Sequence, residues 1–202
     1  MSRYRASSWR GFDPEAACAR PAAAARPLTR ASVRILGLDP GSRRTGFGLI
    51  ESRGSALVPL AHGCLNVASA TPMARLRLIF EGLERLMAEH APVEVAIERV
   101  FVSRNVDSAL KLGQARGAAL CAIPQGIPVF EYAPRAIKLA VVGTGSAEKF
   151  QVAHMICALL ALKERPGADA ADALAVAVCH AHARTLALLS AAGSARALQG
   201  ER

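Results

Sequence analysis

The sequence has no uninterrupted apolar run near the roughly 18 residues that a membrane-spanning helix needs, which predicts a protein without a membrane partner. It also lacks the continuous apolar core of a secretory signal near its N-terminus. The five cysteines are scattered without a CxxC pair, which favours reduced thiols in a cytoplasmic protein over a disulfide framework or a zinc site. His180 and His182 are two positions apart, a spacing that points them in different directions on a helix and argues against a shared metal ion.

The charge, in contrast, is strongly one-sided. Lysine and arginine number 25 against 16 acidic residues, which gives a formal charge of +9. Residues 1–32 hold six arginines and two acids, so 19 basic residues still face 14 acids in the remainder. A basic globular domain favours a polyanionic partner, and nucleic acid is the commonest one.

The 202 residues fit one domain with flanking segments. Residues 1–32 are rich in proline, arginine and small residues without apolar periodicity, so we expect a disordered basic extension. Two other interpretations are a transit peptide, which Asp13 and Glu15 disfavour, and a true translation start at Val33, where a GTG codon would encode methionine. We expect the folded domain over residues 33–190 and a flexible tail over 191–202.

Apolar patterning from residue 33 onward predicts alternating strands and helices. The predicted strands are 33–39, 47–52, 56–67, 93–98 and 127–132. The predicted helices are one opening at Thr71 and Pro72, then 103–122, 134–141, 146–161 and 168–189. Three antiparallel strands followed by αβ units predict an α/β fold, with a five-stranded mixed sheet flanked by helices on both faces.

Four acids stand at positions where a charge is costly. Asp39 and Glu98 each end an apolar strand, while Asp169 and Asp172 are three apart and share one face of a helix. Each of the first three has a structural alternative: Asp39 as a turn residue, Glu98 as a solvated strand end, Asp169 as a helix N-cap. Asp172 is harder to explain in that way, because it lies inside a helix among alanine, leucine and valine.

All four acids converge if the central strands are adjacent and the last helix packs over their ends. Two carboxylates about 4 Å apart repel by roughly 4 kcal/mol at an effective dielectric of about 20, so such a cluster needs cations. An all-oxygen donor set without histidine or cysteine favours Mg²⁺ or Mn²⁺. A pair of such ions can activate water and stabilise both oxygens of a phosphodiester displacement, which predicts a metal-dependent phosphodiesterase.

Around these acids the chain resembles the bacterial RuvC family of crossover-junction endonucleases, over about residues 34–182. The matching segments are RILGLDPGSRRTGFGLI, AIERVFVSRNVDSALKLGQARG, VFEYAPRAIKLAVVGTGSAEKFQVAHM and ADAADALAVAVCHAH. The resemblance implies a ribonuclease-H-like fold. It also implies resolution of four-way Holliday junctions by symmetric paired nicking during homologous recombination and DNA repair.

The resemblance further implies roles for individual residues. The four carboxylates match the family's catalytic, metal-binding positions, which implies Mg²⁺, two ions per site, with Mn²⁺ able to substitute. The residues implied or suggested as DNA contacts are Phe101, Lys138, Lys149, Arg43, Arg44 and Arg99. Phe101 matches an aromatic that stacks on bases, the two lysines match residues for DNA binding and cleavage, and Arg99 stands where the family has glutamine. Without the resemblance, Phe101 would be interpreted as a core residue and the lysines as solvated charges.

The implied partners are four-way junction DNA, a second copy in a homodimer, and the RuvA–RuvB branch-migration complex. The apolar helix 103–122 suits either packing on the sheet or part of a dimer interface.

Three alternatives to this interpretation remain. The segment LDPGSRRTGFGLI also resembles the phosphate-binding hairpin of the sugar kinase, actin and heat-shock ATPase superfamily, but the chain is short and has no second copy of it. A second alternative is a nuclease of the same fold acting on RNA or another DNA structure. The third, a junction-binding protein without activity, is disfavoured by the complete acidic set.

Overall fold

The computed structural model describes residues 32–99 and 105–200, with residues 193–200 as backbone only. The strands are β1 (Val33–Asp39), β2 (Arg44–Arg53), β3 (Ala56–Asn66), β4 (Glu94–Glu98) and β5 (Val129–Tyr132). The helices are α2 (Pro72–His90), α3 (Val106–Cys121), α4 (Pro134–Val142), α5 (Lys149–Leu159) and α6 (Ala168–Gly200). Phe101 and all but the last residue of the expected extension lie outside the described residues.

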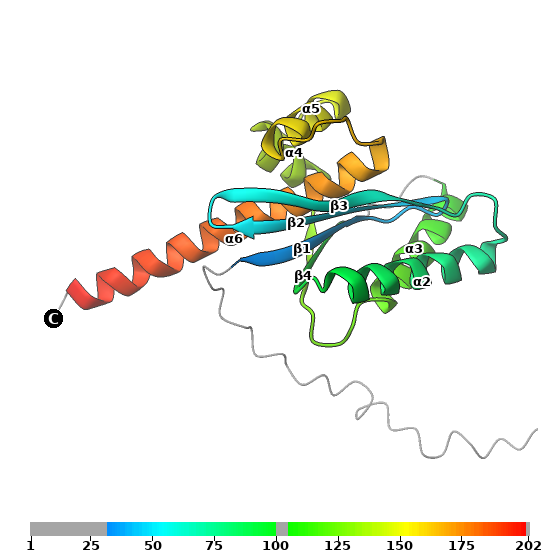
Figure 1. The fold of residues 1–202 in the computed structure, drawn as a ribbon, viewed down its shortest axis with the longest axis horizontal. Coiled ribbons are helices and arrows are strands. Elements are labelled where there is room, and N and C mark those ends of the chain that lie inside the picture. The colour runs from blue at the N-terminus through cyan, green and yellow to red at the C-terminus, as the bar shows by residue number, and fades with distance from the viewer. Residues whose placement is uncertain (1–31, 100–104, 201–202) are drawn as a thin grey trace, which may run out of the picture.

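The five strands form one mixed sheet in the order β3-β2-β1-β4-β5. The first three strands pair antiparallel, whereas β4 pairs parallel with both β1 and β5. Figure 1 shows α4 and α5 on the opposite side of this sheet from α2 and α3. The predicted α/β architecture, with helices covering both faces, is therefore confirmed.

The alternation of side chains along β1 divides the core into two layers. Ile35 packs in the layer of α4, α5 and α6, whereas Leu36 and Leu38 pack in the layer of α2 and α3. In β4, Ala96 belongs to the α6 layer and Ile97 to the other. Because successive side chains point to opposite faces, the residues that end these two strands point to the α6 side.

Two helix boundaries differ from the prediction for local reasons. α5 begins at Lys149 rather than at 146, because Glu148 and Gln151 form a reciprocal capping box. α6 continues to Gly200 through the segment expected as a tail from residue 191. Alanine is the strongest helix former, and a single interior glycine costs only about 1 kcal/mol, so nothing in this alanine-rich sequence ends the helix at 189.

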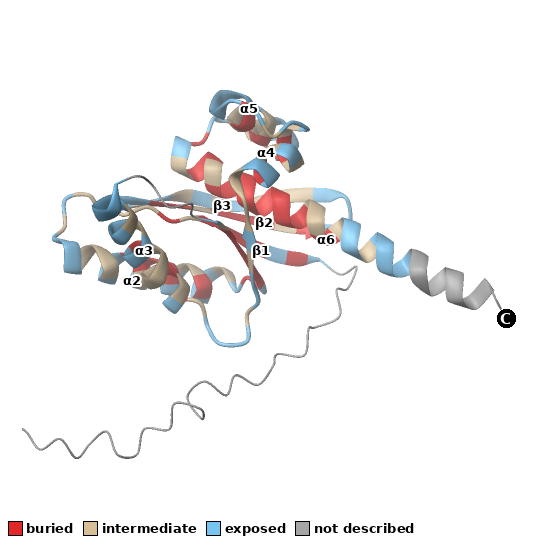
Figure 2. Ribbon diagram, turned by 180° about the vertical axis from the view of Figure 1, so that it is seen from behind, coloured by how far each residue is buried: buried red, intermediate tan, exposed pale blue. Residues whose placement is uncertain are grey.

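α6 is long and apolar enough between Ala168 and Ala192 to cross a membrane by length and composition alone. However, 56% of its most apolar window is buried inside the protein. Figure 2 shows the buried part where α6 crosses the sheet and an exposed part beyond the sheet edge. Packing in the core therefore accounts for its apolar composition.

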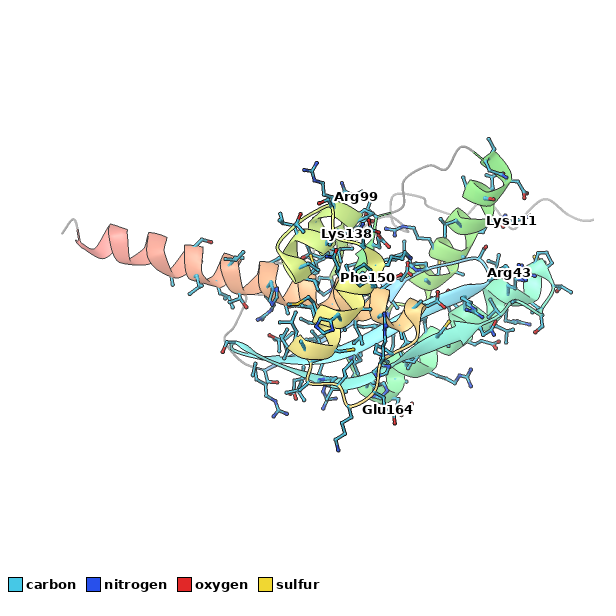
Figure 3. The ribbon with its side chains drawn as sticks, turned by 90° about the horizontal axis from the view of Figure 1, so that it is seen from above. Arg43, Arg99, Lys111, Lys138, Phe150 and Glu164 are labelled. Atoms are coloured by element: carbon cyan, nitrogen blue, oxygen red, sulfur yellow. The ribbon has the colours of Figure 1, made fainter. Side chains whose placement is uncertain are left out.

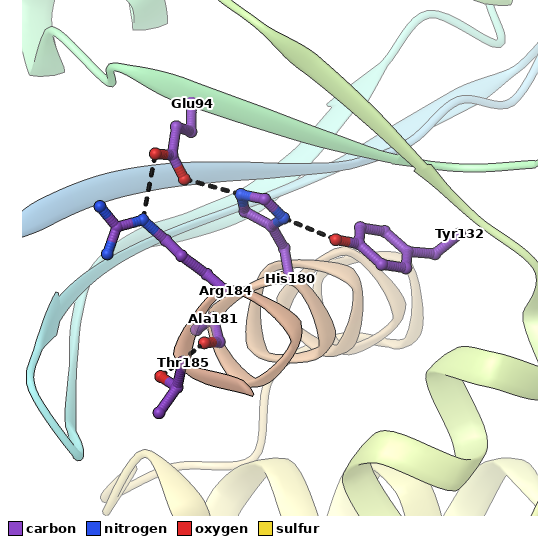
Figure 4. Close-up of polar contacts among 6 residues, drawn as sticks. All are labelled: Glu94, Tyr132, His180, Ala181, Arg184 and Thr185. Carbon is purple, nitrogen blue, oxygen red and sulfur yellow. Dashed lines mark hydrogen bonds and ion pairs between the residues drawn. The ribbon is translucent and has the colours of Figure 1, made fainter. Parts of the chain in front are cut away.

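A buried polar network links α6 to two strands (Figure 4). His180 Nε2 lies 2.8 Å from Glu94 Oε2, and its Nδ1 lies 2.7 Å from the Tyr132 hydroxyl. Arg184 Nε donates to Glu94 Oε1 at 3.1 Å. His182 instead faces the backbone of α4, with Nδ1 3.1 Å from Ala140 O. Each histidine thus has its own structural partner, and the two do not face a common ligand.

Candidate active site

Two of the predicted acids lie side by side at the ends of neighbouring parallel strands. Asp39 is the last residue of β1 and Glu98 the last residue of β4. The preceding residues of the two strands, Leu38 and Ile97, are paired in the sheet. The strand alternation points both carboxyl groups to the side covered by α6. Adjacency of the central strands, on which the convergence of the acids depends, is confirmed.

Glycines bring α6 directly onto this part of the sheet. A Cβ added at Gly46 would lie 2.0 Å from Asp169 O, and one at Gly37 would lie 2.2 Å from Ala173 O. At Gly48 the added atom would lie 2.7 Å from Leu174 N. Any side chain at these positions would have to displace helix backbone. The glycines therefore set the first turns of α6, which carry Asp169 and Asp172, close against β1 and β2.

The carboxyl groups are strongly coupled. Burial, with the nearby charge of Asp172, raises the pKa of Asp39 to about 6. Burial, followed by the charges of Asp39 and Asp172, raises the pKa of Glu98 to about 7. The Asp39 and Glu98 carboxyl groups also share a hydrogen bond. The fully ionised cluster is therefore disfavoured unless positive charge is added.

The two helical acids contact cations of the protein. Lys149 Nζ lies 3.1 Å from Asp172 Oδ2, and this hydrogen bond raises the pKa of the lysine. Arg44 Nη1 lies 3.7 Å from Asp169 Oδ2, which also accepts a 3.5 Å hydrogen bond from Cys64 Sγ. Asp169 is thus turned toward β2 and β3, and Asp172 toward α5.

These rotamers do not enclose an ion. Among residues 32–99 and 105–200, no group of three or more His, Cys, Asp and Glu side chains is arranged to hold a metal. The donor set nevertheless fits a hard divalent cation, because it is made of carboxylate oxygens whose ionisation requires added positive charge. Asp169 and Asp172 would have to leave their contacts with Arg44 and Lys149 to take part in such a site.

A hollow of about 240 Å³ opens beside the acids. Its polar lining consists of Glu98, Asp172, Lys138 and Lys149. Both lysines suggested by the resemblance therefore face the same space as two of the acids. Figure 3 shows Lys138 on α4 and Arg43 on the turn before β2, where its side chain is exposed.

Arg99 and Glu98 belong to a cluster that the sequence does not reveal. Arg116 on α3 donates from Nη1 to Glu98 O at 2.6 Å and from Nη2 to Glu131 Oε1 at 2.7 Å. Arg99 Nε lies 3.8 Å from Glu131 Oε2, so its guanidinium has a partner within the protein although the side chain is 56% exposed. Arg116 and Cys64 were not predicted as site residues. Their contacts depend on the pairing of the strands and the packing of the helices on the sheet, which no local motif encodes.

A mixed sheet in this order, with carboxylates at the ends of its central strands under a close-packed helix, is the arrangement expected of a metal-dependent nuclease of the ribonuclease-H-like class. Residues 35–180 match the family described as crossover junction endodeoxyribonuclease RuvC. The chain belongs to the RuvC family.

Relatives of this family resemble nearly the whole domain. The crossover junction endodeoxyribonuclease RuvC of Marinobacter nauticus is 58% identical over 149 residues, covering 73% of this chain and 85% of that protein. The Halorhodospira halophila enzyme is 55% identical, covering 81% of this chain and 98% of its own length. The structure of T. thermophilus RuvC in complex with a Holliday junction superposes with a TM-score of 0.72 at 32% identity, over 77% of this chain and 96% of that one. The predicted family and fold are confirmed, and the nuclease interpretation holds over the ATPase alternative.

Proposed function

We infer that this protein is a crossover junction endodeoxyribonuclease that resolves four-way Holliday junctions during homologous recombination and DNA repair. The observation that carries this inference is the coupled cluster of Asp39, Glu98 and Asp172, with Asp169 one turn away, in a chain of the RuvC family. A 32% identical relative with the same fold is described in complex with a Holliday junction substrate, which supports a four-way junction as the DNA partner.

Asp39, Glu98, Asp169 and Asp172 are the residues that would hold the metal. We propose Mg²⁺ at two ions per site, with Mn²⁺ able to substitute, because the ligands are all carboxylate oxygens. When bound, two such ions would supply an activated water and stabilise the charge on the attacking and leaving oxygens.

The basic side chains around the acids have a separate role, which is to bind phosphate groups of the DNA. Lys138 and Lys149 line the same hollow as Glu98 and Asp172, so they are placed to hold the oxygens of a phosphate that enters it. Arg44 contacts Asp169 and Arg99 directly follows Glu98, and we propose that these two arginines, with Arg43, bind flanking phosphates. A base-stacking role for Phe101 remains a proposal from the resemblance.

Paired nicking requires two sites related by symmetry, so we propose a homodimer. Large apolar side chains are exposed on α2 and α3: Met73 by 81%, Val106 by 70% and Leu110 by 63%. This apolar surface supports a two-fold interface on the side of the sheet away from α6, although α3 also packs on the sheet through Ala115 and Ala119. We further propose that the dimer acts in the cytoplasm with the RuvA–RuvB complex.

The test is cleavage of a synthetic four-way junction, a linear duplex and an RNA–DNA hybrid, each with Mg²⁺ or with EDTA. Symmetric paired nicks in the junction alone, only with Mg²⁺, are expected. Asp39→Asn should abolish cleavage and keep junction binding, because it removes a metal ligand and not a DNA contact. Glu89→Gln, an exposed glutamate at the end of α2 opposite Met73, is the matched control and should cut normally. Preferential cutting of the duplex or hybrid would refute the proposed substrate.

A further inference from the structure

A second hollow, of about 400 Å³, lies on the other side of α5 from the acids. The residues that line it are Val142, Phe150, Gln151, His154, Met155 and Arg165. Phe150 is 63% exposed, a large aromatic surface left in contact with water. A single exposed apolar residue is common and indicates nothing by itself. The polar groups around Phe150 are what indicate a binding site.

The hollow adjoins the proposed active site. Lys149, the residue before Phe150, reaches Asp172 with its ammonium group, and it lines the acidic hollow together with Val152. Consecutive residues of a helix are separated by about a quarter turn, so the first turn of α5 presents Lys149 to one hollow and Phe150 to the other. Figure 3 labels Phe150 on α5 and Lys138 on α4. A DNA strand that leaves the acids past Lys149 therefore meets Phe150 next.

The lining combines the three groups that recognise a nucleotide. An exposed phenyl ring offers a stacking surface for a base, and a guanidinium such as that of Arg165 binds a phosphate. His154 and Gln151 supply hydrogen bonds for a base edge. Gln151 Oε1 accepts from Glu148 N at 2.7 Å, so its amide NH₂ end is the one available for donation.

The charge of the surrounding segment suits the same ligand. Residues 133–167, which contain α4, α5 and the turns after them, hold five lysines and arginines against two glutamates. A basic surface of this kind attracts a phosphodiester backbone, which carries one negative charge on every nucleotide. A volume of about 400 Å³ is also within the usual range for a site that accommodates one small molecule or one nucleotide.

We propose that this hollow binds one unpaired nucleotide of the DNA strand that leaves the active site, with its base on Phe150 and its phosphate on Arg165. The inference rests on the proposed function and extends it, because it fixes the direction in which one strand leaves the acids. It also gives a reason for an aromatic residue directly after Lys149: the strand is held on both sides of the helix N-terminus.

The experiment uses the full-length protein and a synthetic junction with 2-aminopurine placed singly at nucleotides on either side of the cleavage point. Binding is measured in EDTA, so that no cutting occurs. Phe150→Ala should weaken junction binding about tenfold, the size expected for loss of one stacked base. Phe150→Trp should restore it. At one nucleotide position, 2-aminopurine fluorescence should be quenched by the wild type and the Trp variant but not by the Ala variant.

Leu186→Ala is the matched control, since Leu186 is 67% exposed on the part of α6 beyond the sheet. It should change neither affinity nor fluorescence. A wild type that cuts the junction, with a Phe150→Ala variant equal to it in affinity and in fluorescence at every position, would overturn this inference and leave the proposed function intact.

Two further arms separate the sources of the nucleotide and the two proposals. If free deoxyadenosine monophosphate binds more tightly than the junction, in a manner that depends on Phe150, the hollow is a site for free nucleotides and the strand proposal is wrong. If the wild type fails to cut any junction, the proposed function fails. In that case, the fluorescence of a 2-aminopurine-labelled single strand would still test the hollow as a nucleotide site. Quenching by the wild type but not by Phe150→Ala would support nucleotide binding in the hollow, and absence of that quenching would refute it.

Discussion

The glycine at position 46 should control catalysis more strongly than stability. A methyl group in Gly46→Ala would lie 2.0 Å from Asp169 O, whereas real Cβ atoms essentially never come within 3.0 Å of such an atom. The obstacle is backbone, so no side-chain rotation relieves it. The start of α6 must therefore retreat from the sheet by about 1 Å or more, and it carries Asp169 and Asp172 with it.

The expected magnitudes separate the two effects. Overpacking of this kind costs about 1–3 kcal/mol, which a domain with an ordinary stability of about 5–15 kcal/mol survives in the folded state. A displacement of about 1 Å in a catalytic group can slow a reaction roughly 100-fold. We therefore expect single-turnover junction cleavage by Gly46→Ala to fall about 100-fold at saturating Mg²⁺, with the protein still folded.

The assay is single-turnover cleavage, with junction affinity in EDTA and thermal unfolding measured on the same preparations. Gly167→Ala is the matched control, because Gly167 immediately precedes α6 and an added Cβ there meets nothing within 4 Å. The control should cut within about twofold of wild type, and junction affinity should be retained by both variants. Full cleavage by Gly46→Ala, with its thermal stability lowered, would show that the distance between helix and sheet does not set the catalytic geometry.

Three further outcomes follow from the charges. Lys149→Ala should weaken junction binding. It should also make the slope of the logarithm of the binding constant against the logarithm of salt concentration shallower by about one unit. An unchanged slope would remove Lys149 from the phosphate contacts. The pKa of Asp39 is raised to about 6 and that of Glu98 to about 7, so protons compete with the metal for these carboxylates. The Mg²⁺ concentration needed for half-maximal cleavage should therefore rise as pH falls from about 7.5 to about 5.5. A constant Mg²⁺ requirement would contradict the raised pKa values of these two ligands. Glu94→Gln should lower the free energy of unfolding by about 1.5–3 kcal/mol at pH 7, measured by urea titration, while exposed Glu164→Gln should not.

The sign of the Glu94 effect can be checked by pH. Burial alone would raise the pKa of Glu94, but hydrogen bonds from His180 and Arg184 outweigh it and hold the pKa below the usual value. A carboxyl group with a lowered folded-state pKa stabilises the protein above its ordinary pKa, and that contribution is lost as pH falls through the lowered value. The difference between wild type and Glu94→Gln should therefore be full near neutrality and shrink below about pH 4. A difference that grows in acid would refute the network as its source.

Much of the fold was predictable because its strongest signals are local. The run Val33–Asp39 is apolar enough to be a central strand, and Thr71 followed by Pro72 is a helix start that the structure confirms with a hydrogen bond from Ala74 N to Thr71 Oγ1. The end of α6 was not predictable in the same way. An alanine-rich helix without a strong stop signal has an end that depends on packing against the rest of the protein, which the local sequence does not encode.

The candidate site was predictable in its residues but not in its contacts. Asp39 and Glu98 each end a strand whose preceding residues are mostly apolar, a pattern visible in one sequence. The pairing of Asp169 with Arg44 and Cys64 depends on the registry of β2 with β3, in which Gly46 lies opposite Cys64. The contact of Arg116 with the Glu98 carbonyl joins elements 18 residues apart on different layers. Such contacts are set by packing, and their catalytic value remains a prediction.

The same strand and the same helix carry both the acidic cluster and the buried ionic network, and this arrangement has a mechanical consequence. The glycines of β1 and β2 fix how closely α6 approaches the sheet, while the contacts of Glu94 with His180 and Arg184 fix how far α6 can slide along β4. Glu98 lies four residues beyond Glu94 on that strand, and Asp172 lies two turns before His180 on that helix. These contacts therefore favour a short separation between the two acids although their charges repel. Burial, followed by the charges of Asp39 and Asp172, raises the pKa of Glu98 to about 7, and a bound divalent cation would offset the repulsion.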